Sequence, residues 1–261
     1  MNIDRSKTLS EAAHLRRAAV MEERGMYEEA ANSLIKALTA RPDNADSWSR
    51  LGGLYRSLSK FDMAVEVYKK SLEINPNNSI TQESLLQTYL EMGRYDEAIA
   101  HCKDLLKRMP RNLYARDVLS VAYMQLGLID KALRITDELI RLDPTDPGNH
   151  FKKGVLFQQK GEVGMAIREF ARVIEMAPDS SIAEQAKQAV SSLDSYQLRQ
   201  IVSLASEDSV FRTKLSRDAE SAALEKGFVL SYTGLVALRQ ISFDNPPEPG
   251  DDSGQKYYHY H

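Results

Sequence analysis

The sequence predicts an all-α fold of stacked helix pairs, on the evidence of a period, two helical stripes and a recurring turn residue. Runs of good helix formers, such as LEINPNN, end at a proline, which costs about 3 kcal/mol inside a helix. A regular internal period of this kind indicates a repeat array rather than one or two ordinary domains. The prolines recur every 34 residues, at Pro42, Pro76, Pro110, Pro144 and Pro178.

Each period contains two amphipathic helices joined by a tight turn. In the second period, residues 45–78, two stretches each carry an apolar or small residue at every third or fourth position, which is the spacing of one helix face. The first stripe is Trp48, Leu51, Gly52 and Tyr55, and the second is Ala64, Tyr68 and Ser71. Facing stripes of this kind predict an antiparallel pair, helix A and helix B.

The other blocks follow the same pattern. Helix-A stripes end at Tyr89, Tyr123 and Phe157, and helix-B stripes begin at Ala30, Ala98, Ala132 and Ala166. A glycine, which adopts a left-handed C-cap at little cost, stands between the helices at Gly25, Gly93, Gly127 and Gly161. Ser59 stands there in the second block, where we expect the turn to differ.

These residues resemble the tetratricopeptide repeat family, whose pattern W-x2-L-G-x2-Y…A-x3-F…P the second block matches with Tyr68 for the phenylalanine. The resemblance covers five blocks, 11–44, 45–78, 79–112, 113–146 and 147–180. It implies a right-handed α-solenoid with a concave face. Arg17 and Lys153 replace the leucine of the pattern, and His14 and His150 its tryptophan. We expect the long basic side chains to lay their stems on the core and keep their charges in water.

The rest of the chain falls into four further segments. Residues 1–10 are an N-terminal extension, 181–193 a capping helix with a polar outer face, 194–242 a small helical region, and 243–261 a disordered acidic and aromatic tail. Gly227 is expected to follow a helix end, and Ser231 to cap the next helix.

Composition limits the partner and the compartment. The net charge of −3 resides entirely in 243–261, so the body has no basic excess for nucleic acid. No window approaches 18 uncharged apolar residues and the start lacks the apolar core of a signal peptide, so we expect no membrane span and a cytoplasmic protein. Removal of a signal sequence ahead of the first residue stays open.

No catalytic or metal-binding constellation is visible, so we expect neither an enzyme nor a cofactor. The chain lacks a phosphate-binding glycine loop and a G-x-S-x-G motif, and His14, His101 and His150 lie in separate repeats. Cys102 is the single cysteine and stands at a core position. His259 and His261 near the end supply only two ligands, too few for a closed site.

In the family that the chain resembles, helix A lines the concave surface and contacts the ligand. The matching positions form three rows: Leu15, Ser49, Glu83, Asp117 and Phe151; Ala19, Gly53, Gln87, Val121 and Val155; Glu22, Arg56, Leu90, Met124 and Gln158. Members that clamp the acidic C-terminus of chaperones carry lysine and asparagine in the first two rows. This chain has neither there, so that ligand is disfavoured on electrostatic grounds.

The sequence instead predicts a non-catalytic interaction scaffold whose concave groove binds a partner's peptide or helical segment. Apolar groups beside acids, including Glu91, suit a segment that carries hydrophobic side chains and a lysine or arginine. Some of these apolar groups could instead pack only between neighbouring helices. The predicted groove residues are Ile80, Glu83, Gln87, Leu90, Tyr114, Asp117, Val121, Met124, Phe151, Val155 and Gln158.

The C-terminal region offers an alternative function. "DSVFRTKL" followed by "ESAALEKGFVLS" resembles the helical leader segments of certain ribosomally made natural-product precursors. That resemblance implies a protein of peptide maturation or regulation, with this segment as a recognition handle and the tail as a modifiable peptide or a self-ligand. The other interpretation is a helical subdomain docked on the end of the solenoid, or a dimerisation element.

Overall fold

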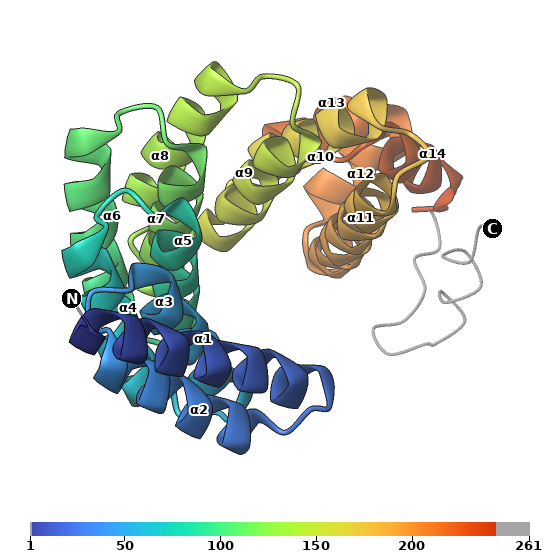
Figure 1. Ribbon diagram of the computed structural model, residues 1–261. Coiled ribbons are helices and arrows are strands. Elements are labelled where there is room, and N and C mark those ends of the chain that lie inside the picture. The colour runs from blue at the N-terminus through green and yellow to red at the C-terminus, as the bar shows by residue number, and fades with distance from the viewer. Residues whose placement is uncertain (1, 244–261) are drawn as a thin grey trace. The chain divides into compact units, whose positions relative to one another are not determined.

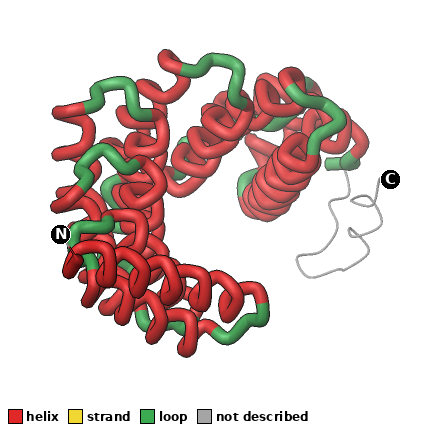
Figure 2. The backbone as a smooth tube through the Cα atoms, in the orientation of Figure 1, coloured by secondary structure: helices red, strands yellow, loops and turns green. Residues whose placement is uncertain are grey.

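The computed structural model describes residues 2–243, with side chains from residue 10, and residues 244–261 lie outside the described residues. The described residues are helices joined by short turns, without a strand (Figures 1 and 2). This confirms the all-α class. The chain divides between Leu128 and Ile129 into two compact units. This boundary falls inside the fourth predicted repeat, so the repeat boundaries remain predictions.

The first unit holds seven helices within the described residues. They are α1 (Asn2–Glu23), α2 (Tyr27–Ala40), α3 (Ala45–Ser57), α4 (Phe61–Ile74), α5 (Ser79–Glu91), α6 (Tyr95–Arg108) and α7 (Leu113–Gln125). Each packs against the next along the chain, and α3 also contacts α5, as α5 contacts α7. Helix α1 begins at Asn2, so residues 2–10 of the predicted extension continue the first helix.

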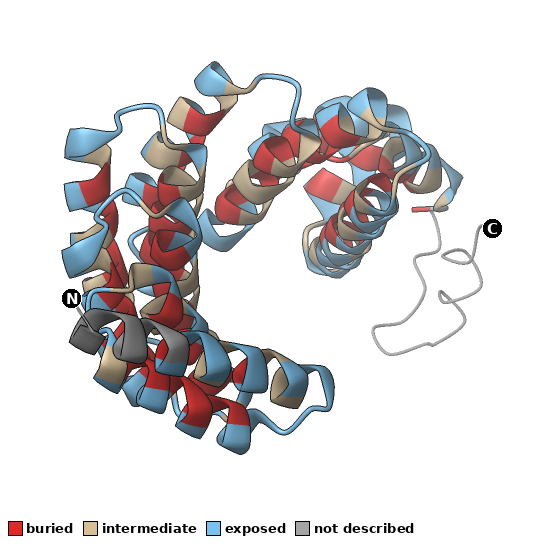
Figure 3. Ribbon diagram, viewed as in Figure 1, coloured by how far each residue is buried: buried red, intermediate tan, exposed pale blue. Residues whose placement is uncertain are grey.

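The second unit also holds seven helices in its described part. They are α8 (Ile129–Leu142), α9 (Pro147–Lys160), α10 (Val163–Met176), α11 (Ser181–Glu207), α12 (Ser209–Arg217), α13 (Ala219–Glu225) and α14 (Tyr232–Gln240). Helices α8 to α11 pack in sequence, α12 and α14 pack on α11, and α13 packs on α12 and α14. Figure 3 shows the buried residues as stripes along the helices.

The residue two places after each of the five periodic prolines caps the next helix. Asn44 accepts a hydrogen bond from the Ser47 amide at 3.0 Å, and Asn78 accepts one from Thr81 at 3.1 Å. The same bond recurs at the starts of α7 and α11, with Asn112 and Ser180 as acceptors, and at the start of α9 Asp146 accepts from the Gly148 amide. Proline therefore ends helix B, and the cap fixes the start of the following helix A.

The turn at Ser59 does not differ from the others, contrary to the expectation. Ser59 adopts a left-handed φ of 56°, close to the 67° of Gly93. Its hydrogen bonds also match, because the Lys60 amide donates to the Tyr55 carbonyl at 2.8 Å just as that of Arg94 donates to the carbonyl of Tyr89. Packing of the two flanking helices therefore outweighs the strain of a β-carbon in this conformation.

Helices A and B approach closely where a glycine faces an aromatic ring. A β-carbon on Gly154 would come within 2.6 Å of the Phe170 ring, and one on Gly52 would overlap the ring of Tyr68. Both rings are almost completely buried. The neighbouring Gly53 has room, since the nearest atom to a β-carbon there is the Tyr68 hydroxyl at 4.0 Å.

The basic residues in the fifth predicted repeat form a buried ionic cluster. Lys153 Nζ lies 2.9 Å from Asp137 Oδ1 and 3.4 Å from Glu169 Oε1. His150 Nδ1 lies 2.7 Å from Glu169 Oε2. The expectation that Lys153 keeps its charge in water is therefore wrong, because the buried Glu169 and the half-exposed Asp137 neutralise it inside the fold.

The capping helix does not end near Leu193 but continues to Glu207 as α11. No proline or glycine interrupts 181–207, and its buried positions continue at helical spacing through Asp194, Gln197, Leu198 and Ile201. The 34-residue period therefore stops without a helix end, because the stripe now packs against the C-terminal helices instead of a further repeat.

Two polar side chains of α11 hold the extended stretch before α14. Gln197 donates to the Val229 carbonyl and accepts from its amide, both at 2.8 Å. Asp194 accepts from the Ser231 amide at 2.8 Å and from the Ser231 hydroxyl. Gly227 has a left-handed φ of 86° and Ser231 caps α14, which confirms both expectations.

The C-terminal helices share one apolar core with the second half of α11. It is centred on Leu198, Ile201, Phe211, Leu215 and Leu238. Phe243, placed in the predicted tail, is only 4% exposed and belongs to this core. The region is thus a helical subdomain packed on the last helix of the array, and its core includes the first residue of the predicted tail.

The adjacent glycines of α3 allow a matched test of this packing. Gly52→Ala should lower the free energy of unfolding by about 1–3 kcal/mol, because its methyl group overlaps the Tyr68 ring. Gly53→Ala should raise it by about 0.5–1 kcal/mol, because alanine favours the helix and meets no close neighbour. Urea unfolding followed by circular dichroism measures both, and equal effects would contradict the proposed packing.

The buried cluster predicts a large cost for removing its acid alone. Glu169→Gln should destabilise the protein by about 3 kcal/mol, because Lys153 and His150 lose their buried carboxylate. The double change Lys153→Leu with Glu169→Val, which copies Leu51 and Val67 of the second repeat, should recover most of this loss. Thermal unfolding of the three proteins is the measurement. A double variant no more stable than Glu169→Gln would show that the ion pair itself stabilises the fold.

Candidate functional site

The predicted groove residues of the first unit form one stripe on each of two neighbouring helices. We call this set the A-helix face. Because α5 contacts α7, and residues three and four apart share a helix face, the two stripes adjoin. The set comprises Ile80, Glu83, Gln87 and Leu90 of α5 and Tyr114, Asp117, Val121 and Met124 of α7.

The A-helix face is accessible, but unevenly. Ile80 is 72% exposed and Glu83 is also exposed. The other six side chains are half-buried. The half-buried apolar side chains therefore serve in part to pack neighbouring helices. Ile80 does not, because most of its side chain is exposed. The half-buried apolar residues are Leu90, Tyr114, Val121 and Met124.

Tyr114 connects the two stripes. Its hydroxyl donates to the Glu83 carbonyl at 3.3 Å, so its ring lies against α5. Burial raises the pKa of this phenol, and the negative charge of Glu83 raises it further. Tyr114 therefore stays protonated and acts as a hydrogen-bond donor and an apolar wall.

Glu91, which the sequence grouped with the acids offered to a basic partner, is already neutralised. Its carboxylate lies 2.8 Å from Arg56 Nη2 and also accepts from Gln87 at 3.2 Å. The sequence could not show this pairing, because Arg56 and Glu91 are 35 residues apart and meet only when α3 packs beside α5. The exposed carboxylate of Glu83 has no ion-pair partner within 10–243.

Tyr68 is a core residue, as the sequence assigned it, and is only 1% exposed, but its hydroxyl has polar neighbours that the sequence did not predict. Its ring passes under Gly52, and its hydroxyl reaches the side of α3 near Gly53. Burial raises the pKa of this phenol, whereas nearby Ser84 and Arg56 act in the opposite direction. The signal available in the sequence was a tyrosine at the pattern's phenylalanine position, facing two adjacent glycines.

The remaining three predicted residues lie on α9, in the second unit, and are described separately. Phe151 is half-buried and packs on Phe170, with ring centroids 5.4 Å apart at an angle of 56°. Val155 is also half-buried, and Gln158 is exposed. Phe151 is therefore partly a core residue of the fifth predicted repeat.

Over the described part of the chain, no three histidine, cysteine, aspartate or glutamate side chains gather to hold a metal ion. His259 and His261 lie outside it. Cys102 is fully buried, and burial raises the pKa of its thiol to about 12. Within the same described range, no helix is long and apolar enough to cross a membrane.

Four family models, each described as tetratricopeptide repeat, match the chain at 45–78, 67–100, 85–147 and 119–191. Together they cover 45–191 without a gap. This chain is therefore a tetratricopeptide repeat protein, which places it among protein–protein interaction scaffolds. No protein of curated function matches the sequence significantly.

Several solved structures have folds similar to that of this chain. MamA, from residue 41 to its end, from Desulfovibrio magneticus RS-1 has a TM-score of 0.58 at 20% identity, over 66% of this chain and 97% of the MamA chain. MamA AMB-1 has a TM-score of 0.54 at 23% identity, over 67% and 95%. YrrB, described as a TPR protein with an unusual peptide-binding site, has a TM-score of 0.54 at 19% identity, over 67% and 90%.

The buried thiol next to this surface predicts a simple reactivity test. At pH 8, a pKa of about 12 leaves only on the order of one Cys102 in ten thousand as thiolate. Native protein should not react with Ellman's reagent within an hour, whereas protein unfolded in urea should release one equivalent of colour. Rapid reaction of the native protein would mean that Cys102 is accessible.

Proposed function

We propose that the A-helix face binds a segment of a partner protein that carries apolar side chains and at least one lysine or arginine. The proposal gives the interaction scaffold a specific ligand chemistry. It assigns no reaction to the chain, and the binding needs no metal or cofactor. YrrB, a repeat protein of similar fold with a peptide-binding site, supports the choice of a peptide ligand.

The observation that carries the proposal is the arrangement of Ile80, Glu83 and Tyr114. Ile80 and Glu83 are one helical turn apart on α5 and both are exposed, and Tyr114 of α7 donates a hydrogen bond to the Glu83 carbonyl. An exposed isoleucine alone is common on protein surfaces. Here it stands one helical turn from an unpaired carboxylate whose backbone is contacted by a tyrosine, and such a combination suits an apolar anchor next to a cation.

The charges on and beside the A-helix face favour a basic partner segment over an acidic one. The pairing of Arg56 with Glu91 cancels the positive charge on α3 that would otherwise attract an acidic segment. Glu83 remains as a negative group on the exposed part of the face. An acidic peptide would meet like charge there, whereas a lysine or arginine would find a carboxylate.

A pair of matched variants on the two sides of the repeat tests this proposal. Ile80→Ala with Glu83→Lys changes the A-helix face. Met63→Ala with Glu66→Lys likewise truncates an apolar residue and reverses an acid three positions later, on α4, where both residues are exposed. The probe is an array of synthetic peptides that combine leucine with lysine, and a second array with glutamate in place of lysine.

The wild-type protein should prefer the lysine peptides. The α5 variant should lose about tenfold or more in affinity for them, because it lacks the apolar contact and reverses the charge. The α4 variant should bind like wild type. Preference for the glutamate peptides, or equal losses in the two variants, would contradict the proposal.

A further inference from the structure

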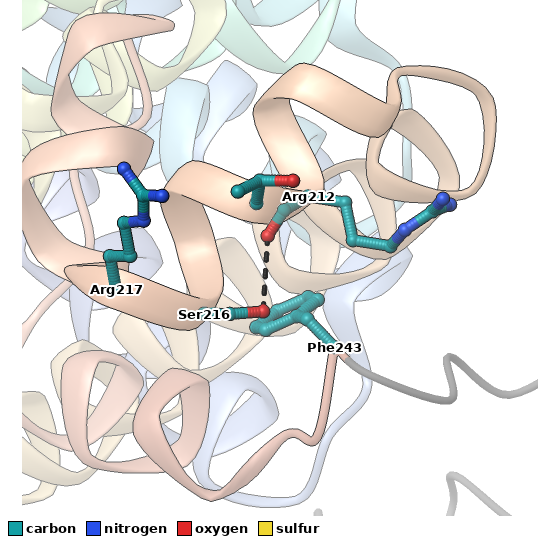
Figure 4. A pocket seen from close by; sticks show the side chains of 5 residues that line it. Arg212, Ser216, Arg217 and Phe243 are labelled. Atoms are coloured by element: carbon teal, nitrogen blue, oxygen red, sulfur yellow. Dashed lines mark hydrogen bonds between the residues drawn. The ribbon is translucent and has the colours of Figure 1, made fainter.

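A second surface, remote in sequence from the A-helix face, lies in the C-terminal subdomain. Arg212, Thr213, Ser216 and Arg217 of α12 line an open pocket of about 280 Å³ together with Phe243. In Figure 4 the two guanidinium groups lie on opposite sides, with the Ser216 hydroxyl and the Phe243 ring between them. The Ser216 hydroxyl donates to the Arg212 carbonyl at 3.3 Å.

The two arginines of this pocket have no acidic partner, in contrast to the other three cations of 208–243. Lys214 is paired with Glu225 at 2.6 Å, Lys226 with Asp208 at 3.2 Å, and Arg239 with Glu220 at 2.6 Å. Within 10–243, neither pocket arginine contacts a carboxylate, and Arg212 donates only to the Ala205 carbonyl at 3.1 Å. The pocket is thus a local excess of positive charge.

Phe243 brings the end of the described chain to this pocket. Its ring is buried in the subdomain core and also forms one wall of the pocket. The next residue along the chain, Asp244, is therefore attached directly to the pocket wall. Any group that follows Phe243 is present at a high effective concentration near Arg212 and Arg217.

The segment that follows carries the complementary charge. Asp244, Glu248, Asp251 and Asp252 stand against the single Lys256. Prolines at 246, 247 and 249 favour an extended backbone, in which four residues span about 12 Å. Arg212 and Arg217 are separated by about 7.5 Å along α12 and point to different sides of it. Two separated cations suit two carboxylates on one extended chain better than one small anion.

We propose that residues 244–252 dock on α12, with their carboxylates at Arg212 and Arg217 and the backbone near Thr213 and Ser216. The contact is a solvent-exposed charge pairing, so it is weak and screened by salt. It holds the aromatic end of the chain, 256–261, close to the subdomain. An acidic segment of another protein would compete for the same arginines.

Paramagnetic relaxation in the full-length protein tests the docking. Because native Cys102 is buried, Ser253→Cys provides a single reactive thiol for a nitroxide label. The measured quantity is the loss of amide signal at Thr213 and Ser216. A charge-removing variant, Arg212→Gln with Arg217→Gln, is compared with Arg168→Gln with Arg199→Gln, which removes the same charge from exposed positions of α10 and α11 outside the pocket.

The docked tail should reduce the Thr213 and Ser216 signals at least about twofold at roughly 50 mM salt, and much less at roughly 500 mM. The effect should disappear in the Arg212 and Arg217 variant and persist in the control variant. No signal loss at these amides, or a loss that the Arg212 and Arg217 variant retains, would overturn the proposal. So would shifts on adding inorganic phosphate without any label effect, since these would define a small-anion site.

Discussion

The structure depends on how closely helix A can approach helix B within each repeat. At this contact, in four of the five predicted repeats, one residue is large where its counterpart is small, and all are buried, so that the total volume changes little among these four. This explains why the single cysteine stands where other repeats carry a ring or a leucine. The pairs of equivalent positions are Ala18 with Leu34, Gly52 with Tyr68, Leu86 with Cys102, and Gly154 with Phe170. In the fourth repeat the equivalent buried residues, Ser120 and Thr136, are both small.

That close contact decides which side chains remain available for a partner. Because helix B fills the space beneath helix A, the positions next to the contact, such as Gly53 and Gln87, face outward. The proline and cap residues then repeat the same orientation at each helix start. The stripe that carries Ile80 and Glu83 is therefore a consequence of the packing, whereas its chemical character is free to vary without loss of the fold.

The helix pairs, their caps and the glycine turns could be predicted because they are local and repeat five times. The features that could not be predicted from the sequence depend mostly on contacts between residues far apart in the chain. Arg56 meets Glu91 only across two stacked helices, and Lys153 finds Glu169 on the facing helix. The length of α11 was missed because its stripe changes partner at Asp194 without changing period. The positions of the candidate site could be predicted from the repeat pattern, but the exposure of Ile80 and the neutralisation of Glu91 could not.

The most direct measurement of the central claim is site-specific photocrosslinking of the intact protein in its native cell extract, with p-benzoylphenylalanine at position 80 or, as a comparison, at the exposed position 63 on α4. The crosslinked segments are then sequenced by mass spectrometry. Our account expects position 80 to yield segments that combine apolar residues with lysine or arginine, and position 63 to yield none enriched in this way. Equal adducts at both positions, or acidic segments at position 80, would contradict it.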